Sequence, residues 1–452
     1  MIGKKTSPDV AIIGMGRTGC SVARFFDARG VAYVTFDEKL KSLPEDIHGS
    51  LRCGALQAKE LKKFARIIVS PGIAWHHPVL LAARESGVQM FGDLDLFREH
   101  YVGDLLAVTG TNGKSTVVHL MGQMLEILPG GVEIGGNIGI PMLDMLNKDP
   151  VSPRAVLELS SFQLERCHGV RPRWAVLLNV QPDHADMHVD MQAYEAAKLR
   201  IFTEQGEGDT AMLPVDDCWD ILATNLQQRG VRVCRFGHVQ NVMQADTGLL
   251  GDTDQRRIFW TAADGTHEVA IDQIMVRGEH QHLNLAVAAQ VAADFGISPT
   301  VIRELLTAFK GLDHRLRYVG QHAGKSWYND SKATNPDAAL AALNSFDQVI
   351  WICGGLTKGV DVMPMLAAVR AHVAQAFVIG KDPQAFVALL EEAGVDYQLM
   401  SDLDNAVAQA AKSNLSLPVL LSPAAASMDQ FPDYAARGFC FSAAVAALKK
   451  AA

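Results

Sequence analysis

The sequence predicts an α/β protein made of three successive units, each built on a mostly parallel sheet. Short apolar strands alternate with helical segments along most of the chain, which is typical of parallel strands joined by crossover helices. Two early strands end in glycine-rich turns that lead into helices, and the alternation starts again near residue 312. A chain of 452 residues is long enough for three domains of about 150 residues each. We therefore place the domains at residues 1–95, 96–311 and 312–452.

The composition is that of a soluble globular protein, with 48% hydrophobic and 20% charged residues. A net charge of −9 argues against a general surface for nucleic acid or anionic membranes, so we expect small-molecule substrates held in local basic pockets. The seven cysteines form no C-x-x-C pair, which favours reduced thiols buried as small apolar residues. We find neither a secretory h-region nor an apolar run of about 18 residues. We expect a cytoplasmic monomer that does not insert into membranes.

The first 37 residues contain a strand, a glycine turn, a helix and a second strand. The turn carries Gly14, Gly16 and Gly19 in the spacing G-x-G-x-x-G, and Asp37 ends the second strand, where a carboxylate is placed to bind a ribose hydroxyl. Taken alone, this Rossmann-like pattern favours a dinucleotide such as NAD. The alternative is another nucleoside diphosphate, because backbone amides at a helix N-terminus recognise pyrophosphate rather than nicotinamide. A further strand-end turn, Ser70-Pro71-Gly72, belongs to the same ligand-binding edge.

The stretch Leu105–Thr116, LLAVTGTNGKST, predicts a phosphate-binding loop of the P-loop type in the second domain. An apolar strand runs into Gly110 and Gly113, and Lys114 then opens a helix whose backbone N–H groups would face a phosphate. The full pattern requires a glycine where Val108 stands. From this motif alone, a simple strand-to-helix turn with an incidental lysine therefore remains an alternative.

The rest of the second domain also alternates strands and helices. Residues 210–275 differ, since their short apolar runs predict an antiparallel appendage, and an alanine-rich helix follows and closes at Gly296. The third domain repeats the doubly wound, Rossmann-like pattern.

Several polar residues at strand ends or on helices are candidates for chemistry. Glu158 follows a buried strand and could hold a metal ion, or it could favour the dipole of the next helix. Lys198 would ordinarily be a solvated helix lysine. Asp183, His184, Asp186 and His188 lie in one loop and could bind a metal ion, or they could be ordinary surface residues. His280 and His282 could also form a metal pair, or they could cap the alanine-rich helix.

Eight short motifs occur in one order over essentially the whole chain: GTNGKST, GGNIG, ELSSFQLE, PDH, AAKLRIF, GLDHR, NDSKATN and LLSPAAASMDQF. Together they resemble the Mur ligase family, and within it the members that add D-glutamate. The phosphate loop without its first glycine is the family's own form. The resemblance implies an ATP-dependent amide synthesis, in which the carboxylate of UDP-N-acetylmuramoyl-L-alanine takes the γ-phosphate of ATP. The amine of glutamate then attacks the acyl phosphate, and a third domain that closes on ATP completes the site.

The resemblance also implies roles for individual residues. It implies two Mg²⁺ ions, held by Ser115, Glu158, His184 and a Lys198 that is carboxylated by CO₂. It implies catalytic roles for Lys114, Glu158, His184, Lys198 and Lys332. It implies contacts to ATP from Gly110, Thr111, Asn112, Gly113, Lys114, Ser115, Thr116, Asn284, Arg315 and Asp330. Gln281 stands where the family often has asparagine, which weakens the assignment of Asn284 to adenine.

For the other substrates, the resemblance changes the first domain from an NAD site to a site for uridine diphosphate. The residues implied there are Gly14, Gly16, Asp37, Ser70 and Gly72, and Asn137 of the second domain would touch the UDP-sugar substrate. Glutamate would be bound by Lys332, Thr334, Lys358, Ser427 and Met428. Asn112 and the Rossmann-like first domain favour glutamate over the substrates of other family branches. The alternatives are a family member that adds another amino acid, or L-glutamate, and an NAD-sensing binding protein with an inert phosphate loop.

Overall fold

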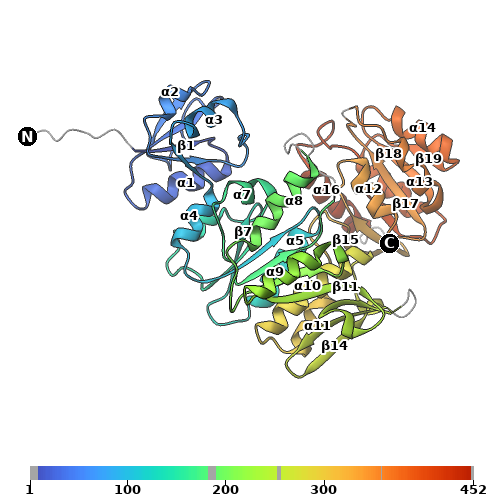
Figure 1. Cartoon of the computed structure of the whole chain (residues 1–452). Coiled ribbons are helices and arrows are strands. Elements are labelled where there is room, and N and C mark those ends of the chain that lie inside the picture. Colours follow the sequence, from blue (N-terminus) through green and yellow to red (C-terminus); the bar gives the residue numbers. More distant parts are fainter. Residues whose placement is uncertain (1–8, 182–189, 252–255, 358, 449–452) are drawn as a thin grey trace, which may run out of the picture. The chain divides into compact units, whose positions relative to one another are not determined.

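The computed structural model describes residues 9–181, 190–251, 256–357 and 359–448, and it confirms an α/β fold with three sheets (Figure 1). Its contacts divide the chain into two compact units. The first comprises Met1–Thr253, Phe259–His267 and Asn284–Ile302, and the second comprises Asp254–Ile258, Glu268–Leu283 and Arg303–Ala452. The domain boundaries after residues 95 and 311 stay a prediction, and residue 95 itself lies within helix α4.

The first sheet has the strand order β3-β2-β1-β4-β5, and all its pairs are parallel. Its central strand β1 is buried over Ala11–Ile13, as expected for a strand covered on both faces by helices. The strands are β1 (Val10–Ile13), β2 (Tyr33–Asp37), β3 (Ser50–Cys53), β4 (Arg66–Val69) and β5 (Gln89–Phe91). The helices are α1 (Arg17–Asp27), α2 (Ala58–Leu61), α3 (Pro78–Arg84) and α4 (Asp93–His100).

The central sheet has nine strands in the order β14-β13-β12-β11-β10-β9-β6-β8-β7, and the pairs from β12 to β7 are parallel. The strands are β6 (Asp104–Thr109), β7 (Glu133–Gly136), β8 (Arg154–Glu158), β9 (Trp174–Leu177), β10 (Thr210–Pro214), β11 (Arg232–Val239), β12 (Thr247–Leu250), β13 (Arg257–Ala262) and β14 (Gly265–Ala270). The helices are α5 (Lys114–Leu125), α6 (Met142–Met145), α7 (Ser161–Arg166), α8 (Met191–Leu199), α9 (Asp220–Gln228), α10 (Glu279–Asp294) and α11 (Pro299–Ala308), with 3-10 turns η1 (Arg200–Phe202), η2 (Asp217–Trp219), η3 (Val242–Gln244) and η4 (Ile271–Gln273).

The prediction of an antiparallel appendage over residues 210–275 is wrong for its first three strands. β10, β11 and β12 pair in parallel and extend the central sheet. The reason is helix α9, which buries Ala223 and Leu226 and provides the crossover that a parallel β10–β11 pair requires. The alanine-rich helix α10 is confirmed, and Gly296 follows it with a positive φ of 80°.

The third sheet has the order β15-β16-β20-β17-β18-β19, in which only the β15–β16 pair is antiparallel. This confirms the doubly wound pattern. The strands are β15 (Arg317–His322), β16 (Lys325–Asn329), β17 (Val349–Gly354), β18 (Val373–Ile379), β19 (Asp396–Leu399) and β20 (Val419–Leu421). The helices are α12 (Pro336–Leu343), α13 (Leu366–His372), α14 (Gln384–Ala393), α15 (Leu403–Lys412) and α16 (Tyr434–Ala447), with the 3-10 turn η5 (Met363–Met365).

The cysteines agree only in part with the expectation from the sequence. All seven are free thiols, but only Cys167, Cys234 and Cys353 are buried. The described part of the chain holds no helix long and apolar enough to cross a bilayer.

Candidate functional site

The phosphate loop joins strand β6 to helix α5, as the sequence predicts. Its two glycines have φ values of 149° at Gly110 and 88° at Gly113, which other residues rarely adopt. A Cβ atom at Gly113 would lie 2.5 Å from the side-chain oxygen of Asn284. The structure therefore brings the predicted adenine residue Asn284 against the loop, in a space that only glycine leaves open.

The side chain of Asn179, which sequence reasoning missed, holds the loop from the end of β9. Its Oδ1 accepts hydrogen bonds from the N–H groups of Thr111 at 3.1 Å and Asn112 at 2.8 Å. Its Nδ2 donates to the carbonyl of Asn112 at 3.1 Å. Lys114 folds back over the same loop, with Nζ 2.7 Å from the carbonyl oxygen of Gly110. The signal in the sequence was weak: Asn179 is the first polar residue after the buried strand WAVL and follows it by two positions.

Three predicted residues meet at the carboxyl ends of neighbouring strands β6, β8 and β7. Glu158 ends β8 and is only 3% exposed. Its Oε2 accepts from the hydroxyl of Ser115 at 2.7 Å, and its Oε1 accepts from the amide of Asn137 at 2.9 Å. A buried carboxylate beside a hydroxyl is the oxygen donor set that Mg²⁺ prefers, so these residues fit the predicted ion.

Lysines on helices are usually solvated, but Lys198 is only 2% exposed. It lies near the end of α8, and its Nζ donates to the carbonyl of Gly110 at 2.8 Å. The same Nζ lies 4.3 Å from the centre of the Tyr194 ring. The structure thus places this lysine at the phosphate loop. His184, with Asp183, Asp186 and His188, lies outside the described residues.

The glycine turn of the first sheet is held by Asp37 and Ser70. Asp37 accepts hydrogen bonds from the N–H groups of Met15 at 2.9 Å, Lys39 at 2.9 Å and Leu40 at 3.0 Å. Burial raises the pKa of this carboxyl group, but the three N–H donors outweigh burial, so the net shift is downward. The hydroxyl of Ser70 donates to the carbonyl of Gly14 at 2.6 Å. Gly14, Asp37 and Ser70 therefore meet at one edge of the sheet.

The remaining glycines of this edge differ in their surroundings. A Cβ atom at Gly19 would lie 1.9 Å from the carbonyl oxygen of Gly14, so helix α1 can approach the turn only with glycine there. A Cβ atom at Gly16 or Gly72 would meet no atom within 4 Å. Gly16 and Gly72 are therefore not required by packing within the chain.

In the third sheet, Asp330 follows β16 and is 9% exposed. It accepts from the hydroxyl of Ser422 at 2.8 Å and from the N–H of Leu316 at 3.0 Å. Burial raises its pKa to about 7. Arg315 lies between His314 and Leu316, which both have a positive φ.

The four predicted glutamate residues that the structure describes lie on two segments, one after β16 and one after β20. Lys332 places its Nζ 4.0 Å from the ring centre of Tyr434 in α16. The N–H of Thr334 donates to the carbonyl of Lys332 at 2.8 Å. On the second segment, Ser427 is buried and Met428 is 56% exposed. Lys358 lies outside the described residues.

His280 and His282 lie within the first turn of α10 rather than ahead of it. Nε2 of His282 is 3.0 Å from the carbonyl oxygen of Val276, and burial lowers the pKa of both histidines. No group of three or more His, Cys, Asp or Glu residues within the described ranges is arranged to hold a metal. We therefore do not assign these histidines to a metal site.

Three family descriptions match this chain in sequence. They are "Mur ligase MurD-like, N-terminal domain" over residues 8–92, "Mur ligase middle domain" over 108–292 and "Mur ligase, glutamate ligase domain" over 314–421. The three matched ranges correspond, in order along the chain, to the first, central and third sheets.

Full-length relatives and solved structures agree with these matches. UDP-N-acetylmuramoylalanine--D-glutamate ligase from Caulobacter vibrioides strain NA1000 is 37% identical over 96% of this chain and 95% of its own length. The enzyme of the same name from Agrobacterium fabrum is 36% identical over 97% of this chain and 95% of its own length. The fold is shared with the crystal structure of UDP-N-acetylmuramate-alanine ligase MurC from Thermotoga maritima, with a TM-score of 0.58 at 16% identity over 98% of this chain and all of that one. The identity to the relatives and the coverage of both chains show that this chain belongs to the Mur ligase family, the ATP-dependent ligases that form amide bonds.

Proposed function

We propose that this chain adds D-glutamate to UDP-N-acetylmuramoyl-L-alanine, with ATP, in the synthesis of peptidoglycan precursors. The observation that carries the proposal is the match over nearly the full length to relatives named for this reaction. The cluster of Ser115, Glu158 and Asn137 beside the phosphate loop supports it, because these are the residues that the sequence resemblance implies.

The chemistry needs an activated carboxylate, because a free carboxylate is a poor electrophile. In the proposed reaction a carboxylate oxygen of the alanyl group attacks the γ-phosphorus of ATP, the bond to the β-phosphate breaks, and ADP leaves. The glutamate amine then attacks the acyl carbon, an amide forms, and phosphate leaves with the C–O bond electrons while the proton lost by the amine passes to the phosphate or to solvent. Lys114 would neutralise charge on the β- and γ-phosphates once it moves from its loop carbonyls to the nucleotide.

Two Mg²⁺ ions are part of the proposal. Ser115 and Glu158 would hold one ion, and His184 with a carboxylated Lys198 would hold the second. When bound, the ions would neutralise the negative charge that two anionic substrates bring together. A carbamate on Lys198 keeps one N–H, so its nitrogen would still donate to the carbonyl of Gly110.

The other predicted roles complete the proposal. The edge of the first sheet, with Gly14, Gly16, Asp37, Ser70 and Gly72, would bind uridine diphosphate, and Asn137 would contact the sugar substrate. The remaining nucleotide contacts would come from Asn284 to adenine, Arg315 to the phosphates and Asp330 to the ribose. Glutamate would contact Lys332, Thr334, Lys358, Ser427 and Met428. We further propose that the enzyme acts as a monomer in the cytoplasm.

The decisive experiment measures phosphate release from ATP with UDP-N-acetylmuramoyl-L-alanine and a panel of amino acids. We expect strong stimulation by D-glutamate and little by L-glutamate or L-alanine. Stimulation by a different amino acid would assign the chain to another branch of the family, and the absence of any stimulation would overturn the proposal.

The NAD-sensing alternative makes an opposite prediction for the first sheet. A micromolar affinity for NAD that is abolished by Gly16→Ala would support that alternative. We expect instead that UDP competes with the full substrate and that NAD does not, measured by isothermal titration calorimetry.

A further inference from the structure

Arg166, the last residue of α7, reaches from the central sheet to the ligand edge of the first sheet. Its Nη1 donates to the carbonyl of Ser70, and its Nη2 donates to the carbonyl of Ile73 at 2.5 Å. The residue is only 2% exposed. The planar guanidinium therefore uses its two terminal nitrogens on two backbone carbonyls of one turn.

The turn that Arg166 holds is Ser70–Ile73, which contains Pro71 and Gly72. The N–H of Ile73 donates to the carbonyl of Ser70 at 3.0 Å, so Arg166 binds the first and last residues of a closed turn. The hydroxyl of Ser70 continues the chain of contacts to the carbonyl of Gly14. Arg166 is thus connected to both turns that we assign to the uridine diphosphate.

Arg166 carries its charge in the interior. Burial lowers its pKa to about 10, while Asp93 and Glu165 favour the charged form, so it is a cation at neutral pH. Asp93 is itself 4% exposed and accepts from the amide of Gln163 at 3.3 Å. Among the described residues, Nε of Arg166 has no hydrogen-bond partner, which leaves the two turn carbonyls as the acceptors of its guanidinium.

The helix that carries Arg166 is fixed at its start. α7 begins after Ser160, which accepts from the N–H of Gln163 at 3.3 Å, while the side chain of Gln163 accepts from the N–H of Ser160 at 3.1 Å. Glu158, which contacts Ser115, lies two residues before this cap. The start of α7 is therefore tied to the edge that holds the phosphate loop.

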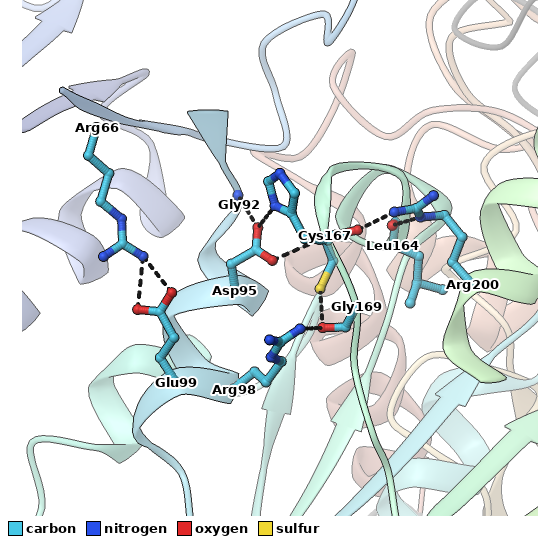
Figure 2. Close-up of polar contacts among 10 residues, drawn as sticks. Arg66, Gly92, Asp95, Arg98, Glu99, Leu164, Cys167, Gly169 and Arg200 are labelled. Atoms are coloured by element: carbon cyan, nitrogen blue, oxygen red, sulfur yellow. Dashed lines mark hydrogen bonds and ion pairs between the residues drawn. The ribbon is translucent and has the colours of Figure 1, made fainter. Parts of the chain in front are cut away.

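The end of α7 is fixed as well (Figure 2). Arg200, just after α8, donates to the carbonyls of Leu164 at 2.9 Å and of Cys167. From α4, Arg98 donates to the carbonyl of Gly169 at 2.9 Å, and Asp95 accepts from the N–H of His168 at 2.8 Å. The two contacts of Arg200 satisfy carbonyl groups that the end of a helix leaves free, and those of Arg98 and Asp95 hold the segment that follows.

We propose that Arg166 is a positioning residue that sets the Ser70–Ile73 turn, and with it the Gly14 turn, in the geometry that binds the uridine diphosphate of the substrate. The inference rests on the proposed function, because it takes that substrate as the ligand of the two turns. Arg166 does not touch the reacting atoms in this proposal, and it acts through the backbone of the turn.

The test compares the full-length enzyme with Arg166→Met and Arg166→Lys in steady-state kinetics. Methionine keeps an apolar stem and loses both hydrogen bonds, so we expect the KM for the UDP substrate to rise about tenfold or more, with the KM for ATP within about twofold. Lysine keeps the charge but not the fork, and its KM should be intermediate. Circular dichroism and thermal unfolding check that each variant is folded.

The matched control is Asp144→Asn. Asp144 in α6 accepts from Arg24 in α1 at 3.0 and 2.6 Å, so it also joins the first and central sheets but does not contact the Ser70 turn. We expect this control to keep the wild-type KM for every substrate. A folded Arg166→Met enzyme with a wild-type KM for the UDP substrate, or with an equal rise for ATP, would overturn the inference.

Two further outcomes are distinguished. If Arg166→Met does not fold, Arg166→Lys decides: a KM for the UDP substrate above that of Asp144→Asn supports the inference, and an equal KM overturns it. If the wild type shows no ligase activity, the proposed function fails, and calorimetric binding of UDP alone still tests Arg166. In that case, weaker binding of UDP to the Arg166 variant than to the wild type supports the inference. Equal binding of UDP to both proteins, or no binding to either, overturns it.

Discussion

Asp330 keeps a carboxyl group in the interior of the third sheet. Burial raises its pKa to about 7, although hydrogen bonds from Ser422 and Leu316 and the charge of Arg315 favour the ionised form. The group therefore changes its ionisation close to neutral pH. A site that binds an anionic nucleotide beside this residue would be sensitive to that change.

The raised pKa predicts a pH-dependent stability. An unfolded aspartate has a pKa of about 3.9, so the folded state holds the proton more tightly and the free energy of unfolding falls as pH rises from about 4 to 7. A shift of about three units corresponds to about 4 kcal/mol. The side chain of asparagine does not titrate. We therefore expect the urea midpoint of Asp330→Asn to rise relative to that of the wild type as the pH increases from about 4 to 7. The exposed Asp404→Asn variant is the control, and an equal trend in both variants would contradict the assignment.

The buried Lys198 is a second residue whose ionic state is expected to control activity. If a carbamate on this buried lysine helps to bind the second Mg²⁺, Lys198→Ala should lose most activity and regain part of it with a small added carboxylate, because the anion replaces the missing charge. We expect ¹³C-bicarbonate to give a carbamate NMR signal in the wild type that Lys198→Ala lacks. Glu195→Ala, an exposed residue of the same helix, should keep wild-type activity. Full activity of Lys198→Ala would refute the proposal.

Among the elements, the phosphate loop depends on the end of β9 and on helix α10 as well as on its own glycines. Asn179 after β9 holds the N–H groups of Thr111 and Asn112, and Asn284 of α10 fills the space beside Gly113. The N–H groups at the start of α5 then remain to face a phosphate, as expected for a helix N-terminus. The loop conformation is thus a property of the sheet edge.

Gly113→Ala tests this arrangement. The new Cβ would lie 2.5 Å from Asn284 and would require a φ of 88°, so we expect the KM for ATP to rise about tenfold, with about 1 kcal/mol of strain. Gly131→Ala is the matched control, because it has a φ of 64° but its Cβ would stay 3.5 Å from the nearest atom, in Glu126. It should lose similar stability and keep the KM for ATP. Equal KM values for the two variants would count against the loop assignment.

At the scale of the whole molecule, the hydrophobic cores divide unevenly among the three sheets. One core is shared by the first and central sheets and includes Phe25, Phe97, Leu157 and Leu226. Two other cores are drawn entirely from residues 316–448. Because cooperative unfolding follows shared cores, we expect the third sheet to unfold separately from the first two.

Calorimetry tests this expectation with two matched substitutions. Leu226→Ala and Leu389→Ala both remove a fully buried leucine, and each should cost about 2 to 5 kcal/mol. We expect two thermal transitions, with Leu226→Ala lowering one midpoint and Leu389→Ala the other. A single transition that both substitutions lower equally would show one cooperative unit.

Much of the fold could be read from local pattern. Strand runs such as DLLAVT, the glycine turns and the helix with Lys198 lie where the sequence predicts them. The antiparallel appendage was wrong because short strands such as RVCRFGHV look alike in parallel and antiparallel pairs, and the crossover helix α9 decides between them. Arg166 and Asn179 gave little signal, since both act through contacts with distant backbone.

The order of strands, turns and helices along the chain, and the family, follow from the amino-acid sequence alone, because periodicity, glycine positions and motif order are local properties of the chain. The tertiary structure decided which residues meet. The sheet places β8 between β6 and β7, although β8 follows β7 along the chain. This order brings together Ser115, Asn137 and Glu158. The contacts of Lys198 with Gly110, and of Arg166 with the Ser70 turn, likewise depend on packing between segments far apart in sequence.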